Sequence, residues 1–432
     1  MNITVVGTGY VGLVTGACFA EFGVRVICVD KEEEKIRRLG RGDIPIYEPR
    51  LEEIVKRAMA SGRLTFTVDL RDAVEKALVI FIAVGTPMSE SGEADLSYVN
   101  EVARGVGASL NGYKVIVTKS TVPMGTGATI RKIIEEISGG SQGFSVASNP
   151  EFLREGSAVE DFMRPNRVVI GAEDPQAVAI LKDLYSPLYL IETPFVITDV
   201  VTAEMIKYAS NAFLAVKISY INEVADLCEA VGANVHQVAR GMGLDRRIGM
   251  KFLHPGPGFG GSCFPKDTRA ALAMARANQT RLRIVDAAVA VNDRRPSRCV
   301  ERMEALVGGL KGRTVAVLGL TFKPNTDDLR ESPAMRVIEL LKKAGARVRI
   351  YDPVAVEAAS RRDPDLLACQ DEYEAATGAD LLVLATEWNQ FRNMDLRRLQ
   401  EVMRQPNVAD LRNIYDPGEM NRLGFSYMSV GR

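Results

Sequence analysis

The chain has 432 residues, of which 47% are hydrophobic and 25% charged, so it is an ordinary globular protein with material for about two to three domains. A formal net charge of −1 gives no indication of a nucleic-acid partner or an acidic membrane surface. Six cysteines without paired spacing and only two histidines argue against a disulfide framework or a metal site, and they predict a reducing compartment, the cytoplasm.

The chain opens on the pattern of a dinucleotide-binding domain. An apolar run, Asn2–Val6, passes directly into the glycine turn GTGYVG, then into helical periodicity and a second strand that ends in Asp30. In this pattern Gly7 permits the tight turn, Gly9 admits a pyrophosphate, and Gly12 lets the helix pack closely on the strand. A carboxylate at Asp30 binds a ribose and repels a 2′-phosphate, which favours NAD over NADP. The same direct passage into a turn predicts that no signal peptide is present.

Further apolar strands alternate with helices, which predicts a parallel sheet covered on both faces. Polar residues cluster where these strands end, the edge at which such sheets bind ligands. Thr86, Thr121 and Glu151 are therefore candidate site residues, although each alone also suits a turn or a helix cap. The predicted strands are 24–29, 78–84, 114–118, 144–147 and 167–171.

A long helix is predicted from Asp199 to Val231, because the stretch has no proline and carries apolar residues at helical spacing. Lys207 and Asn211 lie four residues apart and share one face of it, where they either contact a substrate oxygen or form a solvated polar stripe. Helical patterning continues over 235–242 and from Lys266 to about Arg302. No apolar run approaches the roughly 18 residues of a membrane span.

The loop GFGGSCFPKD places Cys263 just ahead of a predicted helix start. Pro265 suits a first helical position and Asp267 the first turn. A thiol at a helix N-terminus near Lys266 lies in a positive potential that favours the thiolate. The alternative is a buried and inert cysteine.

The last region begins again as an α/β unit that resembles a second Rossmann domain without the glycine triplet. The predicted elements are strands at 314–319, 347–351, 381–385 and 408–409 and a helix at 334–344. The predicted fold is therefore α/β, with two Rossmann-like doubly wound parallel-sheet domains joined by a long central helix. Its predicted domains are 1–198 for NAD, 199–305 for the central helices and the cysteine loop, and 306–432 for a second Rossmann-like unit that suits a nucleotide.

Seven ordered motifs resemble those of one enzyme family over essentially the whole chain. They are GTGYVG at 7–12, GTP at 85–87, KSTVP at 119–123, NPEFLREGSAVEDFMRPNRVVIG at 149–171, AEMIKYASNAFLAVKISYINE at 203–223, KFLHPGPGFGGSCFPKD at 251–267 and GLTFKPNTDDLRESP at 319–333. Together they are similar to the bacterial UDP-glucose 6-dehydrogenases of the UDP-glucose/GDP-mannose dehydrogenase family. The segments DFMRPNRVVIG and HPGPGFGGSC resemble the UDP-glucose branch most.

The resemblance implies a four-electron oxidation of the sugar's primary alcohol to a carboxylate, with two NAD reduced per sugar. Lys207 and Asn211 are implied to bind the oxygen at the reacting carbon, and Cys263 to form a thiohemiacetal and then a thioester. Thr121, Glu151 and Asp267 are implied to position or activate the hydrolytic water, with Glu151 as the preferred general base. The division of proton transfer among Glu151, Asp267 and Lys207 stays open.

The resemblance also implies the binding residues and at least a dimer, since Arg247 resembles an arginine inserted into the partner subunit's sugar site. The alternative for Arg247 is a surface charge. The cofactor residues are Gly7, Gly9, Tyr10, Val11, Gly12, Asp30, Lys35, Thr86, Thr121, Glu155, Lys266 and Arg330. The substrate residues are Phe152, Leu153, Arg154, Glu155, Lys207, Asn211, Arg247, Phe252, Leu253, His254, Pro255, Gly256, Gly260 and Lys323, where Lys323 suits a pyrophosphate as a point charge.

Three alternatives stay open at this point. A sister branch acting on GDP-mannose or a UDP-N-acetylhexosamine keeps the mechanism and changes the sugar. A two-electron 3-hydroxyacid dehydrogenase shares the helix lysine and asparagine, but the Cys263 loop and the second Rossmann-like domain count against it. A non-catalytic NAD sensor would carry a damaged lysine, asparagine or cysteine position, and none of them is damaged here.

Overall fold

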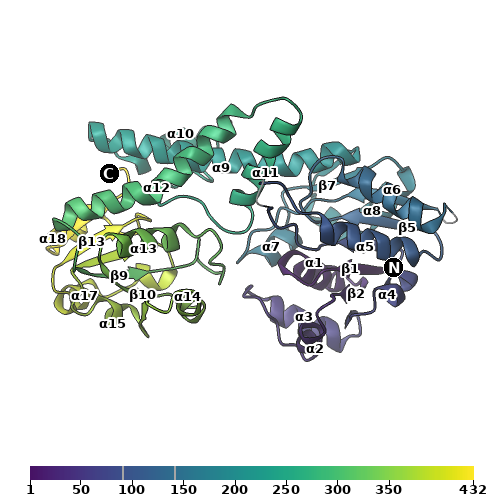
Figure 1. The fold of residues 1–432 in the computed structure, drawn as a ribbon, viewed down its shortest axis with the longest axis horizontal. Helices are drawn as coiled ribbons and strands as arrows, with labels where there is room; N and C mark the ends of the chain where they lie inside the picture. Colours follow the sequence, from purple (N-terminus) through teal and green to yellow (C-terminus); the bar gives the residue numbers. More distant parts are fainter. Residues whose placement is uncertain (90–91, 141–142) are drawn as a thin grey trace. The chain divides into compact units, whose positions relative to one another are not determined.

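The protein, described here from a computed structural model that covers residues 1–89, 92–140 and 143–432, divides into two compact units. The first is Met1–Ser210 and the second is Asn211–Arg432. Each unit is built on one β-sheet, coloured purple to blue in the first and green to yellow in the second (Figure 1). The boundary falls inside α9, Val200–Val231, a helix of 32 residues. Within the described ranges, no helix is both long and apolar enough to cross a membrane.

The sheet of the first unit has eight strands in the order β3-β2-β1-β4-β5-β6-β7-β8. From β3 to β6 all neighbours are parallel, so their carboxyl ends share one edge. β7 pairs with β6 in the antiparallel sense, and β8 runs parallel to β7. The strands are β1 (Asn2–Val6), β2 (Arg25–Val29), β3 (Leu64–Thr67), β4 (Val79–Ile82), β5 (Lys114–Thr118), β6 (Phe144–Ser148), β7 (Val168–Ala172) and β8 (Phe195–Thr198).

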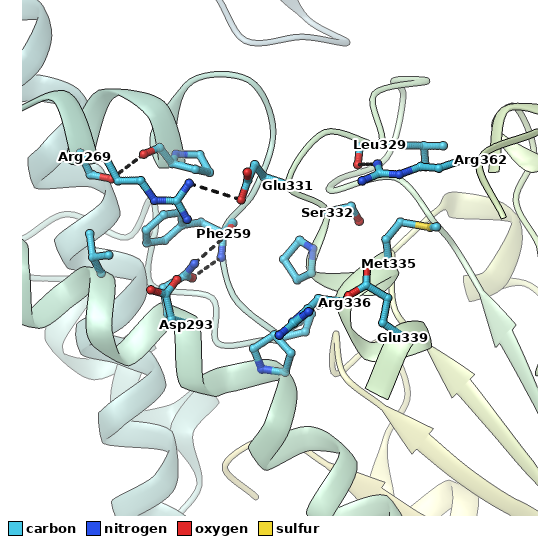
Figure 2. A pocket seen from close by; sticks show the side chains of 17 residues that line it. Phe259, Arg269, Asp293, Leu329, Glu331, Ser332, Met335, Arg336, Glu339 and Arg362 are labelled. Carbon is cyan, nitrogen blue, oxygen red and sulfur yellow. Dashed lines mark hydrogen bonds and ion pairs between the residues drawn. The ribbon is translucent and has the colours of Figure 1, made fainter. Parts of the chain in front are cut away.

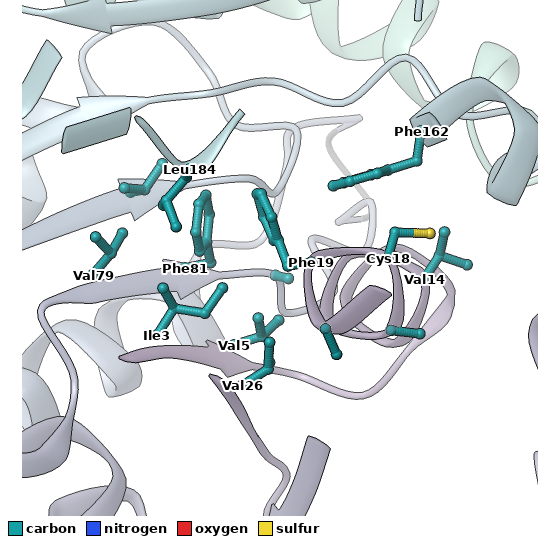
Figure 3. Packing of buried hydrophobic residues seen from close by; sticks show 14 of the residues in the cluster. Ile3, Val5, Val14, Cys18, Phe19, Val26, Val79, Phe81, Phe162 and Leu184 are labelled. Carbon is teal, nitrogen blue, oxygen red and sulfur yellow. The ribbon is translucent and has the colours of Figure 1, made fainter. Parts of the chain in front are cut away.

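Helices cover both faces of this sheet, and the largest core cluster lies between the sheet and α1 (Figure 3). Phe19 of α1 is fully buried, with its ring centroid 5.3 Å from that of Phe81 on β4 and 5.1 Å from that of Phe162. These contacts fix the helix that follows the glycine turn. The helices are α1 (Tyr10–Glu21), α2 (Glu33–Gly40), α3 (Leu51–Ala60), α4 (Leu70–Lys76), α5 (Ser97–Ala108), α6 (Thr126–Ser138), α7 (Ala158–Met163), α8 (Pro175–Leu184) and the 3₁₀ helix η1 (Ser186–Ile191).

The second unit contains a six-stranded sheet in the order β11-β10-β9-β12-β13-β14, with every neighbouring pair parallel. Its strands are β9 (Thr314–Leu318), β10 (Arg347–Tyr351), β11 (Leu367–Ala368), β12 (Leu381–Leu384), β13 (Asn407–Asp410) and β14 (Ser426–Ser429). Its helices are α10 (Val235–Gly243), α11 (Phe264–Ala277), α12 (Arg283–Val307), α13 (Pro333–Lys343), α14 (Val356–Arg362), α15 (Glu372–Ala376), α16 (Asn389–Arg392), α17 (Leu396–Val402) and α18 (Pro417–Arg422).

The predicted fold class is confirmed, and β1, β5 and β10 have the predicted bounds. One prediction is wrong: the helical stretch from Lys266 to Arg302 is two helices, separated between Ala277 and Arg283. The chain leaves helical geometry at Gln279, whose φ is +55°, a left-handed conformation that ends a helix. The three predicted domains stay a prediction beside the two compact units.

Candidate active site

The turn between β1 and α1 has the geometry of the dinucleotide fingerprint. Gly7 has a φ of +101°, which only glycine adopts without strain. A Cβ on Gly12 would lie 1.9 Å from the Gly7 carbonyl oxygen, so the helix packs directly on the turn. A Cβ on Gly9 would meet nothing within 4 Å. The space above Gly9 therefore fits the close approach of a ligand, as the sequence predicts for a pyrophosphate.

Asp30, at the end of β2, closes this turn. Its carboxylate accepts hydrogen bonds from the Thr8 amide (2.9 Å) and hydroxyl (2.6 Å), and it pairs with Lys35 at 2.9 Å. Partial burial raises the pKa of Asp30, but the hydrogen bonds from Thr8 and Lys35 outweigh burial and hold the value at about 2. A carboxylate that stays ionised at neutral pH fits an NAD ribose and disfavours an additional phosphate.

Tyr10, predicted to bind the cofactor, points its hydroxyl to a carboxylate that the sequence analysis missed. It donates to Glu48, and the Gly156 amide lies 2.7 Å from both the Tyr10 hydroxyl and the Glu48 carboxylate. This network joins the start of α1 to the predicted substrate loop at 152–155. No local pattern indicates it, because its members are more than thirty residues apart in sequence.

Two of the threonines predicted at strand ends are joined: the Thr86 hydroxyl donates to the Thr121 carbonyl at 2.9 Å. The loop that carries Thr121 then enters α6, whose N-terminal amides of Gly125 and Gly127 donate to Glu204 of α9 at 2.7 and 2.9 Å. Burial raises the pKa of Glu204 to about 7, against the lowering effect of these two hydrogen bonds. Glu204 thus ties the Thr121 loop to the helix of Lys207, a role that its place in the motif at 203–223 did not indicate.

Glu151 and Lys207 form a buried ion pair. The Lys207 Nζ lies 2.9 Å from the Glu151 carboxylate and 2.7 Å from the Glu151 carbonyl oxygen, and both side chains are 4% exposed. The other carboxylate oxygen of Glu151 accepts from the Leu153 amide at 2.5 Å. The structure therefore brings a predicted base and a predicted oxygen-binding lysine into direct contact, an arrangement that can exchange a proton.

The neighbouring substrate-loop residues are held by cationic contacts. The Arg167 guanidinium lies 3.4 Å from the ring centroid of Phe152, and Lys207 Nζ lies 5.4 Å from the same ring. Arg154 pairs with Asp161 at 2.6 Å while its side chain stays 53% exposed. Arg154 is thus oriented and accessible, as a group that contacts a ligand phosphate or hydroxyl must be.

Cys263 immediately precedes α11, whose first residue is Phe264, and is half-buried. This confirms the predicted helix start, with Pro265 in the first turn. The Ser262 hydroxyl lies 3.5 Å from the Cys263 sulfur. Lys266, expected to add positive potential, pairs with Asp267 at 2.6 Å, which offsets part of its charge. The helix N-terminus itself adds positive potential that favours a thiolate.

Asn211 and Asp267 meet in the second unit. The Asn211 amide donates to the Asp267 carboxylate at 2.6 Å, and the Asp267 side chain is 1% exposed. Asp267 therefore receives one neutral and one charged donor, from Asn211 and Lys266, which fixes its orientation one turn after Cys263. The predicted catalytic residues thus fall into two groups: Thr121, Glu151 and Lys207 in the first unit, and Asn211, Cys263 and Asp267 in the second.

The loop before Cys263 is held by close backbone contacts. A Cβ on Gly260 would lie 2.2 Å from the Glu331 carbonyl oxygen, and the Gly256 amide donates to Asn222 at 2.8 Å. Phe252 has a φ of +66°, and Leu253 and Pro255 are buried while His254 is exposed. This rigid loop accounts for the glycines and prolines of the predicted substrate segment.

Asn292 of α12 was not predicted, and it clamps the same loop. Its amide accepts from the Phe259 amide nitrogen at 2.7 Å and donates to the Phe259 carbonyl at 3.1 Å. Both residues line a cavity of about 520 Å³ (Figure 2). Three arginines and three acids in its lining balance one another, so its charge selects no ionic ligand: Arg269, Arg336, Arg362, Asp293, Glu331 and Glu339.

Three further predicted residues, Arg247, Lys323 and Arg330, lie on connecting segments of the second unit. The Arg330 side chain is 65% exposed and pairs with Asp328 at 2.8 Å. Arg247 is 89% exposed and pairs with Asp245 two residues earlier. Lys323 is half-buried in the long connection between β9 and α13. Among the described residues, no three His, Cys, Asp or Glu side chains are grouped so as to hold a metal ion.

Comparison with known proteins places these features in one family. Residues 1–189 match the NAD binding domain of the UDP-glucose/GDP-mannose dehydrogenase family, residues 201–294 its central domain, and residues 316–417 its UDP binding domain. A UDP-glucose 6-dehydrogenase of Rhizobium meliloti (strain 1021) is 55% identical over 436 residues, which cover 100% of each chain.

Solved structures agree. A UDP-glucose dehydrogenase from Pyrobaculum islandicum superimposes with a TM-score of 0.92 at 41% identity, covering 99% of this chain and 96% of that one. A UDP-D-ManNAc dehydrogenase from Pyrococcus horikoshii gives a TM-score of 0.88 at 28% identity, covering 100% of this chain and 99% of that one. The fold is shared by both, and the identity is higher for the dehydrogenase of UDP-glucose.

Proposed function

Because the chain belongs to the UDP-glucose/GDP-mannose dehydrogenase family, we propose that it oxidises UDP-glucose to UDP-glucuronate with NAD as the electron acceptor. One UDP-glucose, one water and two NAD⁺ give UDP-glucuronate, two NADH and three protons. The observation that carries the proposal is the position of Cys263 at the N-terminus of α11, with the carboxylate of Asp267 one turn later. A two-electron dehydrogenase needs no such thiol.

The residues of the first turn fit NAD. Open space above Gly9 accommodates a pyrophosphate, and the ionised Asp30 accepts hydrogen bonds from a ribose. When bound there, NAD supplies the hydride acceptor for both oxidations. Lys35 and Thr86 are assigned to the same site, together with Gly7, Tyr10, Val11, Gly12, Thr121, Glu155, Lys266 and Arg330.

The first oxidation needs a group that withdraws the hydroxyl proton from the primary alcohol of the sugar. Lys207 and Asn211 are assigned to bind that oxygen, with a charge and a hydrogen-bond donor that favour the developing alkoxide. Lys207 already contacts Glu151 at 2.9 Å, so the carboxylate is placed to receive the proton.

The second oxidation is assigned to Cys263. Its thiolate attacks the aldehyde carbon, the carbonyl oxygen becomes the thiohemiacetal oxygen, and loss of a hydride from that carbon leaves a thioester. The covalent bond keeps the aldehyde from escaping between the two oxidations. Water then attacks the thioester, the carbon–sulfur bond breaks, and thiolate and carboxylate result. Thr121, Glu151 and Asp267 are assigned to that water, with Glu151 as general base.

Substrate binding is assigned to the two loops that the structure holds rigid, and to Lys323 for the pyrophosphate. Arg247 supports a dimer, because its side chain is 89% exposed and pairs with Asp245 on its own loop, so it is accessible to a partner subunit. We place the dimer in the cytoplasm, where UDP-sugars and NAD are both available. Light scattering should give about twice the 47.2 kDa of one chain, and Arg247→Ala should raise KM for UDP-glucose.

The test is the amount of NADH formed per sugar nucleotide with limiting UDP-glucose and excess NAD, beside GDP-mannose and UDP-N-acetylglucosamine. We expect two NADH from UDP-glucose alone. Two from another sugar would keep the mechanism and change the substrate, and one would reject the thioester route. Cys263→Ser should stall turnover, whereas Cys369→Ser, a half-exposed cysteine elsewhere in the second unit, should turn over normally.

A further inference from the structure

Lys119 is a buried lysine that the proposed reaction does not use. It follows β5 directly, and its side chain is enclosed, with the residue only 4% exposed. The Nζ donates to the Asn149 side-chain oxygen at 2.9 Å and to the Tyr185 hydroxyl at 3.1 Å. Both acceptors are neutral. No carboxylate in the described part of the chain lies within ion-pair distance of this nitrogen.

A buried ammonium without a counter-ion is costly. Burial lowers the pKa of Lys119 to about 7, the Glu151 carboxylate opposes that shift, and the charge of Lys207 adds to it. Lys119 therefore changes charge near neutral pH while it is electrostatically coupled to both members of the Glu151–Lys207 pair. Coupling of this kind is mutual, so the pair responds to the charge of Lys119.

Geometry links the same residues. Asn149 is fixed by its own amide, which donates to the Val169 carbonyl at 2.7 Å, and its backbone nitrogen donates to the Thr118 carbonyl at 2.9 Å. Two residues later the Glu151 carbonyl accepts from Lys207 at 2.7 Å. The bond from Lys119 to Asn149 thus holds the start of the turn whose end carries the predicted base.

A cavity of about 50 Å³ is lined by both Lys119 and Glu151, and this volume is enough for one or more waters. The other charged groups in its lining are Asp161, which pairs with Arg154, and Arg167, which lies over the Phe152 ring. The Tyr185 hydroxyl also faces it and donates to Asn149 at 2.6 Å. Of the described residues that line it, none offers Lys119 a carboxylate at ion-pair distance, and Glu151 pairs with Lys207, which is outside the lining.

We propose that Lys119 is a positioning residue for the dehydrogenase reaction, which holds the Asn149–Glu151 turn and sets the charge state of the Glu151–Lys207 pair. A protonated Lys119 favours the Glu151 carboxylate and opposes the Lys207 ammonium. A neutral Lys119 releases both effects. Because the inference rests on the proposed function, its test needs one readout that does not depend on turnover.

The kinetic test uses Lys119→Met, which keeps the volume of the side chain and leaves Asn149 bonded to Tyr185. We expect kcat to fall roughly 10- to 100-fold, as for the loss of a group that supports acid–base catalysis. KM for UDP-glucose should change less than about threefold, and the inflection of kcat near pH 7 should disappear. Tyr185→Phe is the matched control: it removes the two hydrogen bonds of the Tyr185 hydroxyl, to Lys119 and to Asn149, keeps the lysine and its bond to Asn149, and should retain the inflection. A Lys119→Met enzyme with the kcat and pH profile of the wild type would overturn the proposal.

The second readout is the titration of Lys119 in the wild-type protein, followed by NMR after labelling the lysine ε-carbons with ¹³C. One resonance, absent from Lys119→Met or Lys119→Arg, should titrate with a midpoint near pH 7. Midpoints above about pH 9 for every lysine would overturn the proposal even if Lys119→Met does not fold. If the wild type forms no NADH from UDP-glucose, the proposed function fails, and this titration still decides whether Lys119 changes charge beside Glu151.

Discussion

The first strand of each Rossmann-like sheet leads into a glycine turn, and the two turns differ in what surrounds them. β1 is followed directly by Gly7 and β9 by Gly319, with φ of +101° and +86°. In both, an aspartate at the end of the second strand reaches back to the turn: Asp30 accepts from the Thr8 amide at 2.9 Å, and Asp352 from the Leu320 amide at 2.8 Å. The local sequence after the strand therefore folds alike in the two units.

The difference lies in what else binds the two carboxylates. Asp352 is 2% exposed and also accepts from the amides of Val354 and Ala355 and from the Trp388 indole. Asp30 is bonded to Thr8, to Lys35 and to the Glu32 amide, and its side chain is 11% exposed. A carboxylate saturated by its own protein holds a fold together, whereas one with accessible oxygen can bind a ligand.

The two turns also differ in where the next helix begins. α1 begins at Tyr10, so its N-terminus is part of the turn, whereas α13 begins at Pro333 after a long connection. The first unit can present helix amides to a pyrophosphate. The second presents side chains of its connection, among them Lys323 and Arg330. We therefore expect the same strand-and-turn frame to give a backbone site in one unit and a side-chain site in the other.

The largest expected effect comes from adding a side-chain atom between α1 and the glycine turn of the first unit. In Gly12→Ala the new Cβ would lie 1.9 Å from the Gly7 carbonyl oxygen, so α1 must move away from the turn. We expect NADH affinity to fall by at least roughly 1,000-fold, about 4 kcal/mol. Fluorescence titration with NADH measures it. Gly112→Ala, whose Cβ would meet nothing within 4 Å, is the control, and near-normal affinity in Gly12→Ala would contradict the geometry.

Asp352→Asn should act on stability instead of on NAD. One amide oxygen replaces two carboxylate oxygens that serve the turn, the next loop and Trp388, so buried donors lose their acceptor. We expect a loss of about 2–3 kcal/mol in the free energy of unfolding, measured with urea, and an unchanged NADH affinity. Weaker NADH binding without a change in stability would reverse the roles that the two aspartates have here.

Asp30→Asn should show the opposite pattern, with NAD affinity about tenfold lower, or 1.4 kcal/mol, and weaker discrimination against NADP. The folded-state pKa of Asp30, about 2, is below its ordinary value of 3.8. The carboxylate therefore stabilises the fold above about pH 4, and that contribution is lost as the pH falls through 2. Between pH 5 and 9 the group stays ionised, so calorimetric NAD titrations should show no step from it.

The features that the sequence predicted are those that neighbouring residues determine. The glycine turns, α9 and the position of Cys263 before α11 follow from local spacing, turn chemistry and helix-start residues. Lys119, Glu48 and Asn292 were missed because their partners are 30 or more residues away, and no periodicity connects them.

The helix boundaries show the same limit. The chain leaves α11 near Gln279 without glycine or proline, whereas α12 continues through Pro296. β8 was missed because it is short: its apolar run has only three residues, fewer than the four to eight that indicate a buried strand. Packing over the whole unit, and not the preference of single residues, decides such elements.

The smallest predicted effect measures the contribution of one hydrogen-bond donor to Asp352, the Trp388 indole. Trp388→Phe keeps a buried aromatic ring and removes only the indole N–H, which lies 3.2 Å from the Asp352 carboxylate. Four backbone amides still bind that carboxylate, so we expect a loss of about 1 kcal/mol in the free energy of unfolding and no change in NADH affinity. Thr8→Val is the counterpart in the first unit, because it removes the hydroxyl that lies 2.6 Å from Asp30. We expect Thr8→Val to lose about as much stability as Trp388→Phe and also to bind NADH more weakly. This result would show that the two turns differ because the Asp30 carboxylate is accessible. Equal effects of the two substitutions on NADH affinity would contradict it.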